Sequence, residues 1–506
     1  MPHIPQRIPI HWPVWILAGI AATAASAETC DELGSLSFGH TEIVSAGLIA
    51  AGEFEAPGRF SGRGSQAYSG LPEFCRVEAT ARPAAGSEIG IEIWLPASGW
   101  NGNVQGVGNG GWAGSISYSA MARALAAAYV AASTDTGHRG QGPDFALENP
   151  DKLIDFAHRA VHEMTVTAKA VTEAFYQRGH ERAYFIGCST GGRQAMAEAQ
   201  RYPDDYDGIV AGAPAYYPSH IQGMQVFTAT VSNRSTAARI GEQEFGLIND
   251  AAIAACDTID GVEDGVIEDP RQCRFNPAVL ACPDAGGDVC LSPEQVETVR
   301  QIYRGPVTQS GGSIFPGLAR GSERGWTTLS GSEPLSLARE TYALLVFEDT
   351  EWNWSDFDAE ADIATAVERI GPLMDSNDPD VGNFIARGGR LLLYHGWNDP
   401  GIPPGGTIHY YEQTQATLGV DESDNAVKLF MVPGMNHCGG GTGTDQFDAI
   451  AALDQWLTTD RAPERIEAER RVNGELVRSR PLCPYPSVAS YDGSGRTDQA
   501  ASFDCR

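Results

Sequence analysis

The stretch Ala183-Tyr184-Phe185-Ile186-Gly187-Cys188-Ser189-Thr190-Gly191-Gly192 decides the fold of this chain. An apolar run of the strand type leads directly into Gly-x-Ser-x-Gly, and a helix-forming run over 193–200 follows. This context is typical of a serine on a tight strand-to-helix turn with its hydroxyl exposed. The helix would supply free N–H groups where an oxyanion forms. A glycine-rich loop capped by serine is the alternative, but the flanking strand and helix favour Ser189 as a nucleophile.

The composition is that of a globular protein with a strongly acidic surface. The chain has 506 residues, of which 42% are hydrophobic and 20% charged, and 35 Lys+Arg against 65 Asp+Glu give a net charge of -30. Nucleic acids and anionic membranes would repel such a surface, so neither is expected as a partner. The length allows one large domain with an insertion, or two to three domains.

The N-terminus has the pattern of a secretory signal. Arg7 precedes an apolar run over 12–25, and Ala25-Ser26-Ala27 fits the small-residue cleavage rule. We therefore predict a signal peptide over 1–27 and a soluble protein that is periplasmic or secreted. The apolar run is too short for a comfortable membrane span, and no later segment approaches one.

Strand and helix patterns alternate along much of the chain. Strands are expected at 92–95, 104–107, 129–133, 390–394 and 427–432, and a helix is expected over 156–176. This alternation predicts an α/β fold with a largely parallel sheet.

The alternation stops after residue 214. The segment 215–380 reads as loop-rich, with four cysteines and aromatic residues such as Trp352 and Trp354, and it is typical of an inserted lid. The predicted division is therefore a first core part over 28–214, a lid over 215–380 and a second core part over 381–506. The tail from Cys483 to Arg506 is expected to be irregular.

Two polar residues follow apolar strands late in the chain, in the order that a serine hydrolase needs. Asp399 lies in His395-Gly396-Trp397-Asn398-Asp399, and His437 follows the strand 427–432. Parallel sheets build their sites at such strand ends, and the order Ser, Asp, His is that of the α/β-hydrolase fold. His395 is the rival base, but its place beside the acid suits a pocket wall better. We predict a triad of Ser189, Asp399 and His437.

The ten cysteines are expected to form disulfides in an exported chain. Spacing alone does not determine the connectivity, but pairing of nearest neighbours would leave Cys188 and Cys438 unpaired. These two directly adjoin Ser189 and His437. If they bond, their Cα atoms lie within about 7 Å, which is the separation expected of triad neighbours. An even cysteine count and export also argue against Cys188 as a thiol nucleophile.

Together these motifs resemble the tannase and feruloyl esterase family, whose site is a Cys-Ser, Asp, His-Cys arrangement. The resemblance covers 30–505 and includes Gly110-Gly111-Trp112-Ala113-Gly114, residues 133–138 and residues 315–317. It implies an α/β-hydrolase core with a large inserted lid domain. It also implies five disulfides: Cys188–Cys438, Cys30–Cys75, Cys256–Cys273, Cys282–Cys290 and Cys483–Cys505.

The resemblance further implies a serine carboxylic ester hydrolase that acts on aromatic-acid esters and needs no organic cofactor. Feruloyl esters of plant cell walls are the first expectation, and gallate esters of tannins or terephthalate monoesters are the alternatives. No carboxylate-binding arginine can be placed, so a terephthalate preference has no support in the sequence. The oxyanion hole is expected from the N–H of Thr190 and from Gly110 or Gly111.

His395 and Trp397 are the predicted pocket residues. Aromatic side chains such as Trp326, Phe347 and Trp397 could stack on a substrate ring. Packing within the core of the lid is the alternative for each of them.

An acidic segment, residues 257–269, has the oxygen donors that calcium prefers. Its spacing is not that of an EF-hand, and a solvated acidic turn is the alternative. The family resemblance implies structural Ca²⁺ in the lid, bound by the side chains of Asp257, Asp260 and Asp264 and by the carbonyls of Val262 and Val266.

Two other functions are compatible with parts of the pattern. A catalytically inactive secreted calcium-binding module would have lost at least one of the three triad residues, and all three are present. A peptidase on the same fold would use the same triad, so only substrate testing separates it from an esterase.

Overall fold

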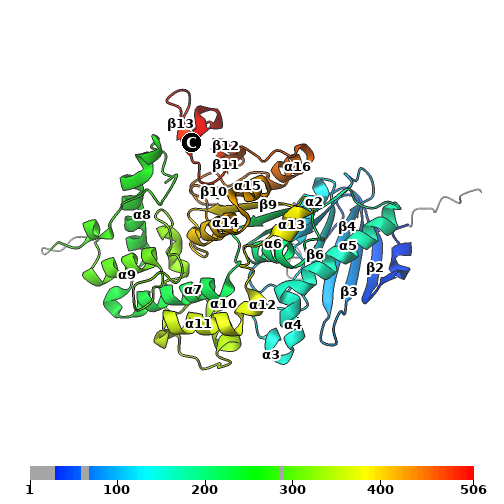
Figure 1. Cartoon of the computed structure of the whole chain (residues 1–506), viewed down its shortest axis with the longest axis horizontal. Helices are drawn as coiled ribbons and strands as arrows, with labels where there is room; N and C mark the ends of the chain where they lie inside the picture. Colours follow the sequence, from blue (N-terminus) through cyan, green and yellow to red (C-terminus); the bar gives the residue numbers. More distant parts are fainter. Residues whose placement is uncertain (1–28, 58–67, 284–289) are drawn as a thin grey trace, which may run out of the picture.

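The computed structural model describes residues 29–57, 68–283 and 290–506. The predicted signal peptide lies outside the described residues. A single ten-stranded sheet organises the chain, in the order β1-β2-β3-β4-β6-β5-β7-β8-β9-β10 (Figure 1). Its strands are β1 (Ser37–Phe38), β2 (Thr41–Ile49), β3 (Phe74–Ala81), β4 (Ile89–Pro96), β5 (Asn103–Val107), β6 (Val130–Thr134), β7 (Arg182–Cys188), β8 (Gly208–Gly212), β9 (Arg390–Gly396) and β10 (Val427–Val432).

The six strands from β6 to β10 in this order are parallel, as predicted, and β1–β4 extend the sheet in antiparallel pairing. Every residue of β10 is buried, because parallel strands are covered on both faces. All five predicted strands exist. The first three antiparallel strands were not predicted.

Helices cover both faces of the sheet (Figure 1). On one face α5 and α6 pack against the strands, and on the other α2 and α16 do so. The helix predicted over 156–176 is present, but a π-helical turn, η3 (Asp155–Arg159), precedes α5. The α-helices are α2 (Tyr118–Ala126), α3 (Phe145–Glu148), α4 (Pro150–Ile154), α5 (Ala160–Tyr176), α6 (Thr190–Arg201), α7 (Pro218–Asn233), α8 (Glu242–Cys256), α9 (Pro293–Arg304), α10 (Ser336–Glu340), α11 (Ala359–Arg369), α12 (Gly371–Met374), α13 (Gly382–Ala386), α14 (Pro404–Leu418), α15 (Val420–Ala426) and α16 (Ala449–Thr459).

The chain leaves the sheet after β8 and returns at β9, its direct neighbour. Between them α7 to α11 form a separate lobe, green to yellow in Figure 1. The expectation of a loop-rich segment was therefore wrong. Helix α9, for example, begins with a capping box in which Ser292 and Gln295 bond each other's backbone N–H groups, a signal present in the sequence. The lid boundaries at 215 and 380 stay a prediction.

The C-terminal segment forms two small antiparallel sheets. One pairs β11 (Ile466–Val472) with β12 (Glu475–Leu482), and the other pairs β13 (Ala489–Tyr491) with β14 (Phe503–Cys505). The prediction of an irregular tail over 483–506 was wrong for β13 and β14, because strands of three residues are too short to show a pattern. The remaining short helical turns are η1 (Glu32–Ser35), η4 (Thr236–Ala238), η5 (Asp257–Asp260), η6 (Pro277–Leu280), η7 (Glu323–Thr328), η8 (Thr341–Val346), η9 (Trp354–Asp356) and η10 (Ala500–Ser502).

All five disulfides that the family resemblance implied are present in the structure. Proteins of oxidising compartments are the ones that keep such bonds. None of the helices in the described ranges is both long enough and apolar enough to pass through a bilayer.

Candidate active site

Ser189 lies on the sharp turn between β7 and α6. Its backbone φ of 64° and ψ of -122° are unusual for a residue with a side chain. The turn can be this tight because the neighbouring glycines have no Cβ and pack directly against other backbone atoms. A Cβ on Gly187 would lie 2.4 Å from the carbonyl carbon of Gly191, and one on Gly191 would lie 2.9 Å from the carbonyl oxygen of Asn109. Glycine is thus required at both positions of the motif.

Asp399 and His437 form a short hydrogen bond beyond the ends of β9 and β10. Nδ1 of His437 lies 2.6 Å from Oδ2 of Asp399, whose side chain is fully buried. The other carboxylate oxygen, Oδ1, accepts the N–H groups of Gly401 at 2.8 Å and Ile402 at 2.9 Å. Because Nδ1 faces the acid, Nε2 is the ring nitrogen that is free to accept a proton from a hydroxyl.

Both ionisable groups of this pair have shifted pKa values. Burial raises the pKa of Asp399, but hydrogen bonds from His395 and His437 outweigh burial and bring it well below its usual value. Burial lowers the pKa of His437, but the hydrogen bond to Asp399 and its charge outweigh burial and raise it above its usual value. The pair therefore favours an ionised acid beside a histidine that binds a proton readily.

His395 lies behind Asp399 and not in a pocket wall, so that prediction was wrong. The side chain is fully buried, and its Nε2 lies 3.1 Å from Oδ2 of Asp399 and 3.1 Å from the carbonyl of Ile402. A carbonyl only accepts, so Nε2 carries the proton. Nδ1 then accepts from the Thr407 hydroxyl at 2.7 Å. His395 is thus a positioning residue that fixes the carboxylate.

A cavity of about 390 Å³ opens onto Ser189, Thr190 and His437. Its wall is mostly apolar and includes Trp112, Phe156, Leu329, Leu335, Leu337 and Met374. Trp112 belongs to the glycine-rich motif quoted from the sequence, but its role in the wall was not predicted. One face of α7 completes the wall, and no sequence motif marks that face.

The aromatic residues proposed for stacking lie elsewhere. Trp397 does not line the cavity and packs in the core on one face of the sheet, so its prediction as a pocket residue was wrong. Trp326 is fully buried in the core between α8 and α9. Phe347 packs against the core around Tyr342. Trp326 and Phe347 therefore pack in the core of the lobe, as the alternative states, whereas Trp397 packs in the core of the sheet.

Two of the three residues predicted for the oxyanion hole, Thr190 and Gly111, line the cavity together with Ser189. Thr190 is the first residue of α6, where a backbone N–H has no partner within the helix. Gly111 lines the same cavity, and its carbonyl accepts the Thr190 hydroxyl at 2.9 Å. Gly110 lines a different cavity, so Gly111 is the glycine of this pair on the side of Ser189.

The Cys188–Cys438 disulfide connects the two halves of the site. It joins the residue before Ser189 to the residue after His437 across a sequence separation of 250, and its Cα atoms lie 6.0 Å apart. The serine turn and the histidine loop therefore cannot separate while the bond is intact.

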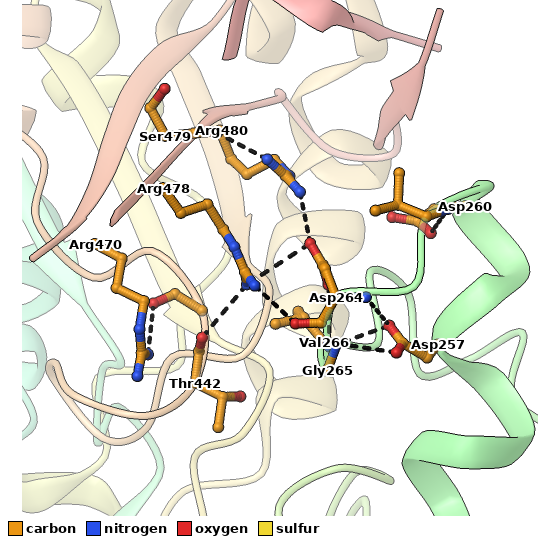
Figure 2. Close-up of polar contacts among 12 residues, drawn as sticks. Asp257, Asp260, Asp264, Gly265, Val266, Thr442, Arg470, Arg478, Ser479 and Arg480 are labelled. Atoms are coloured by element: carbon orange, nitrogen blue, oxygen red, sulfur yellow. Dashed lines mark hydrogen bonds and ion pairs between the residues drawn. The ribbon is translucent and has the colours of Figure 1, made fainter. Parts of the chain in front are cut away.

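The acidic segment of the lobe curls around one carboxylate. Asp257 accepts the backbone N–H groups of Asp264, Gly265 and Val266 at 2.9–3.2 Å (Figure 2). Asp260 and Asp264 each accept an N–H two residues further on. Carboxylate and carbonyl oxygens are the ligands that calcium prefers. In the described residues, no three acidic, His or Cys side chains already converge on one point, so metal binding here would have to bring the aspartates together.

Arginines of the β11–β12 hairpin connect this acidic loop to the loop that follows His437 (Figure 2). Arg480 Nη2 lies 2.5 Å from Oδ2 of Asp264. Arg478 donates to the carbonyl of Asp264 at 2.7 Å and to that of Thr442 at 3.5 Å. Arg470 donates to the carbonyl of Gly441 at 2.5 Å.

Comparison with known proteins identifies the family of this chain. A profile described as "Tannase and feruloyl esterase" matches residues 75–506. The chain belongs to this family. It is a carboxylic ester hydrolase of the tannase and feruloyl esterase type, on an α/β-hydrolase fold.

Individual relatives agree with this assignment. An uncharacterised esterase of Xanthomonas campestris pv. campestris is 35% identical, over 97% of this chain and 93% of the relative. A probable feruloyl esterase B-2 of Aspergillus terreus is 31% identical, over 87% and 88%. The crystal structure of feruloyl esterase B from Aspergillus oryzae superimposes with a TM-score of 0.87 at 27% identity, covering 94% of this chain and 99% of that chain.

The pH dependence of activity tests the Asp399–His437 pair. A base must be unprotonated, so activity rises as pH passes the pKa of His437, and its raised value places the acid limb of kcat/KM above about pH 6.5. Asp399→Asn removes the charge that raises this pKa. We expect the limb to move to lower pH and kcat/KM to fall by about 10⁴-fold.

The measurement is kcat/KM from pH 4 to 9 on one ester, with Asp421→Asn on the exposed first turn of α15 as the matched control. An acid limb that stays in place in Asp399→Asn would contradict the pairing.

Proposed function

We propose that this protein is an exported serine esterase that hydrolyses esters of aromatic acids, with feruloyl esters as the first choice. The main support for this proposal is the mostly apolar cavity that opens onto Ser189 and His437. An aromatic acyl group is flat and apolar, and such a cavity would bury it. The names of the relatives, feruloyl esterase B among them, support the same substrate class.

In the proposed first step, Ser189 attacks the ester carbonyl carbon. Nε2 of His437 takes the serine proton, and ionised Asp399 stabilises the resulting imidazolium through Nδ1. The developing oxyanion lies at the start of α6, where the N–H of Thr190 and an N–H from the Gly111 side stabilise it. His437 then protonates the leaving alcohol, and an acyl-enzyme remains on Ser189.

The second step returns the enzyme to its starting state. A water molecule gives a proton to His437 and attacks the acyl carbonyl, and a second oxyanion forms at the same place. Its collapse releases the aromatic acid, and the proton on His437 returns to Ser189. No organic cofactor takes part in this scheme.

The cavity wall favours a neutral acyl group over an anionic one. Arg193 is the charged residue among the described lining residues, apart from the histidine of the triad. Its Nη1 and Nη2 already donate to the carbonyls of Ala157 at 2.5 Å and Phe156 at 3.0 Å. A terephthalate monoester would place its carboxylate in a wall with no other cation, so gallate esters are the stronger alternative.

We also propose that the acidic loop binds one structural Ca²⁺. The side chains of Asp257, Asp260 and Asp264 and the carbonyls of Val262 and Val266 would hold it. The oxygen-only donor set supports this proposal, and Arg480 would share Asp264 with the ion. A bound ion would stabilise the loop and would take no part in the ester chemistry.

Turnover by the purified protein tests the proposed activity. The substrates are methyl ferulate, methyl gallate, a terephthalate monoester and a peptide amide, with product chromatography as the measurement. We expect release of ferulate or gallate, and a fall of about 10⁴-fold or more in Ser189→Ala. Folded protein that turns over none of the esters would contradict the proposal.

Thermal unfolding tests the calcium site independently of activity. If the loop binds calcium, a chelator removes binding free energy from the folded state alone, so Tm falls and is restored by added Ca²⁺. Asp257→Asn and Asp260→Asn should abolish this response, whereas Asp358→Asn, at the start of α11, should keep it. A Tm that does not respond to chelator or Ca²⁺ means that Arg480 and the backbone N–H groups hold the loop alone.

A further inference from the structure

Another cavity lies between α2 and α16 on one face of the sheet, and the proposed ester chemistry does not use it. Its volume is about 1280 Å³. Helix α2 packs on β6, and α16 packs on β8 and β9, so part of the face of β5 and β7 stays open between the two helices. Cys188 and Cys438 line this cavity, whereas Ser189 and His437 line the other one. The two cavities are therefore neighbours on either side of the triad loops.

The floor of the cavity between α2 and α16 is formed by side chains of the sheet itself. Gln105 and Tyr184 lie opposite each other in β5 and β7, so Ile186, two residues further on, points to the same face. Tyr394 of β9 extends this floor across β8, because a Cβ on Gly212 would lie only 2.1 Å from its Cζ. The floor thus combines an apolar side chain with an amide and a phenol.

Gln105 is a polar residue in this floor that has no hydrogen bond. It is 6% exposed, and neither its Oε1 nor its Nε2 bonds any residue that the structure describes, although neither atom is sealed off from the cavity. Tyr129 and Tyr394 also line the cavity, and in the described ranges their hydroxyls have no partner either. Buried polar groups are almost always hydrogen-bonded, so the partners of these three groups have to come from the contents of the cavity.

The lining determines which ligand would match. An amide and a phenol each offer both a donor and an acceptor, and so do the hydroxyl groups of a carbohydrate. The rings of Tyr118 and Phe447 add apolar surface against which the C–H face of a sugar ring can pack. The charged residues among the described lining residues are Arg123, Asp445 and Asp448. One cation beside two carboxylates does not favour an anion, so the matching ligand is neutral.

We propose that the cavity between α2 and α16 binds a neutral carbohydrate, with the amide of Gln105 bonding sugar hydroxyls at its floor. This site is distinct from the cavity of Ser189, so the inference goes beyond the proposed esterase function. A sugar that is esterified to the aromatic acid and a free oligosaccharide carry the same hydroxyls. Because Cys188 and Cys438 adjoin two triad residues, the bound sugar lies close to the reacting ester in either case.

Isothermal titration of the Ser189→Ala variant with a neutral arabinoxylan oligosaccharide tests this site without turnover. We expect binding, and we expect it to be at least about fivefold weaker after Gln105→Leu in the same background, as the loss of a hydrogen bond predicts. Tyr129→Phe should also weaken binding. Its hydroxyl bonds no other residue in the described part of the chain, so this change leaves the fold intact. An oligogalacturonate, which is anionic, should bind more weakly than the neutral oligosaccharide.

Gln415→Leu is the matched control, because Gln415 lies on α14 and its amide donates to the hydroxyl of Tyr411, away from this cavity. Affinity for the oligosaccharide should stay unchanged there. No binding at millimolar oligosaccharide, or binding that Gln105→Leu and Tyr129→Phe both leave unchanged, would overturn the proposal. So would complete displacement of the sugar by methyl ferulate, which would assign it to the cavity of Ser189.

The kinetics of the active enzyme distinguish the two sources of the sugar. If the sugar belongs to the ester substrate, Gln105→Leu lowers the ratio of kcat/KM for a feruloylated arabinoxylan oligosaccharide to kcat/KM for methyl ferulate. If the ligand is a free oligosaccharide, this ratio does not change. Wild-type protein that hydrolyses no ester would contradict the proposed function, and the binding test would still decide whether this site exists.

Discussion

The Cys188–Cys438 disulfide is the constraint on which the candidate site depends. Ser189 and His437 come from strands that are separated by a long stretch of chain, including the whole helical lobe. The bond holds the Cα atoms of their two neighbours 6.0 Å apart. In the chain-entropy view, closing so long a loop stabilises the folded state by on the order of 5 kcal/mol. This one covalent bond thus contributes both to the stability of the fold and to the geometry of the site.

Around this bond, each candidate catalytic group is held by backbone or buried side chains. The turn at Ser189 depends on glycines whose Cβ atoms would collide with facing backbone. Both oxygens of Asp399 are engaged, one by N–H groups of the following loop and one by two histidines. Such preorganisation means that little has to move when charge develops during a reaction.

Local patterns in the sequence predicted the sheet core and the candidate triad, because each of these residues lies directly beside a strand with a clear apolar run. The wall of the cavity could not be predicted in this way. His395 and Trp397 lie within four residues of Asp399 in sequence, yet neither lines the cavity: His395 contacts the carboxylate of Asp399 and Trp397 packs in the core. The face of α7 that lines the cavity comes from the segment that was expected to be loop-rich, and only tertiary packing brings that helix over Ser189.

The most direct test of this account is the rate at which Ser189 reacts with an organophosphorus ester, followed by peptide mass mapping. The wild-type protein is compared with Cys188→Ser/Cys438→Ser at a temperature where circular dichroism shows both to be folded. We predict a single adduct on Ser189 and labelling at least about 100-fold slower without the disulfide, because a displacement of about 1 Å between reacting groups can slow a reaction about 100-fold. Equal labelling rates, or an adduct on another residue, would contradict it.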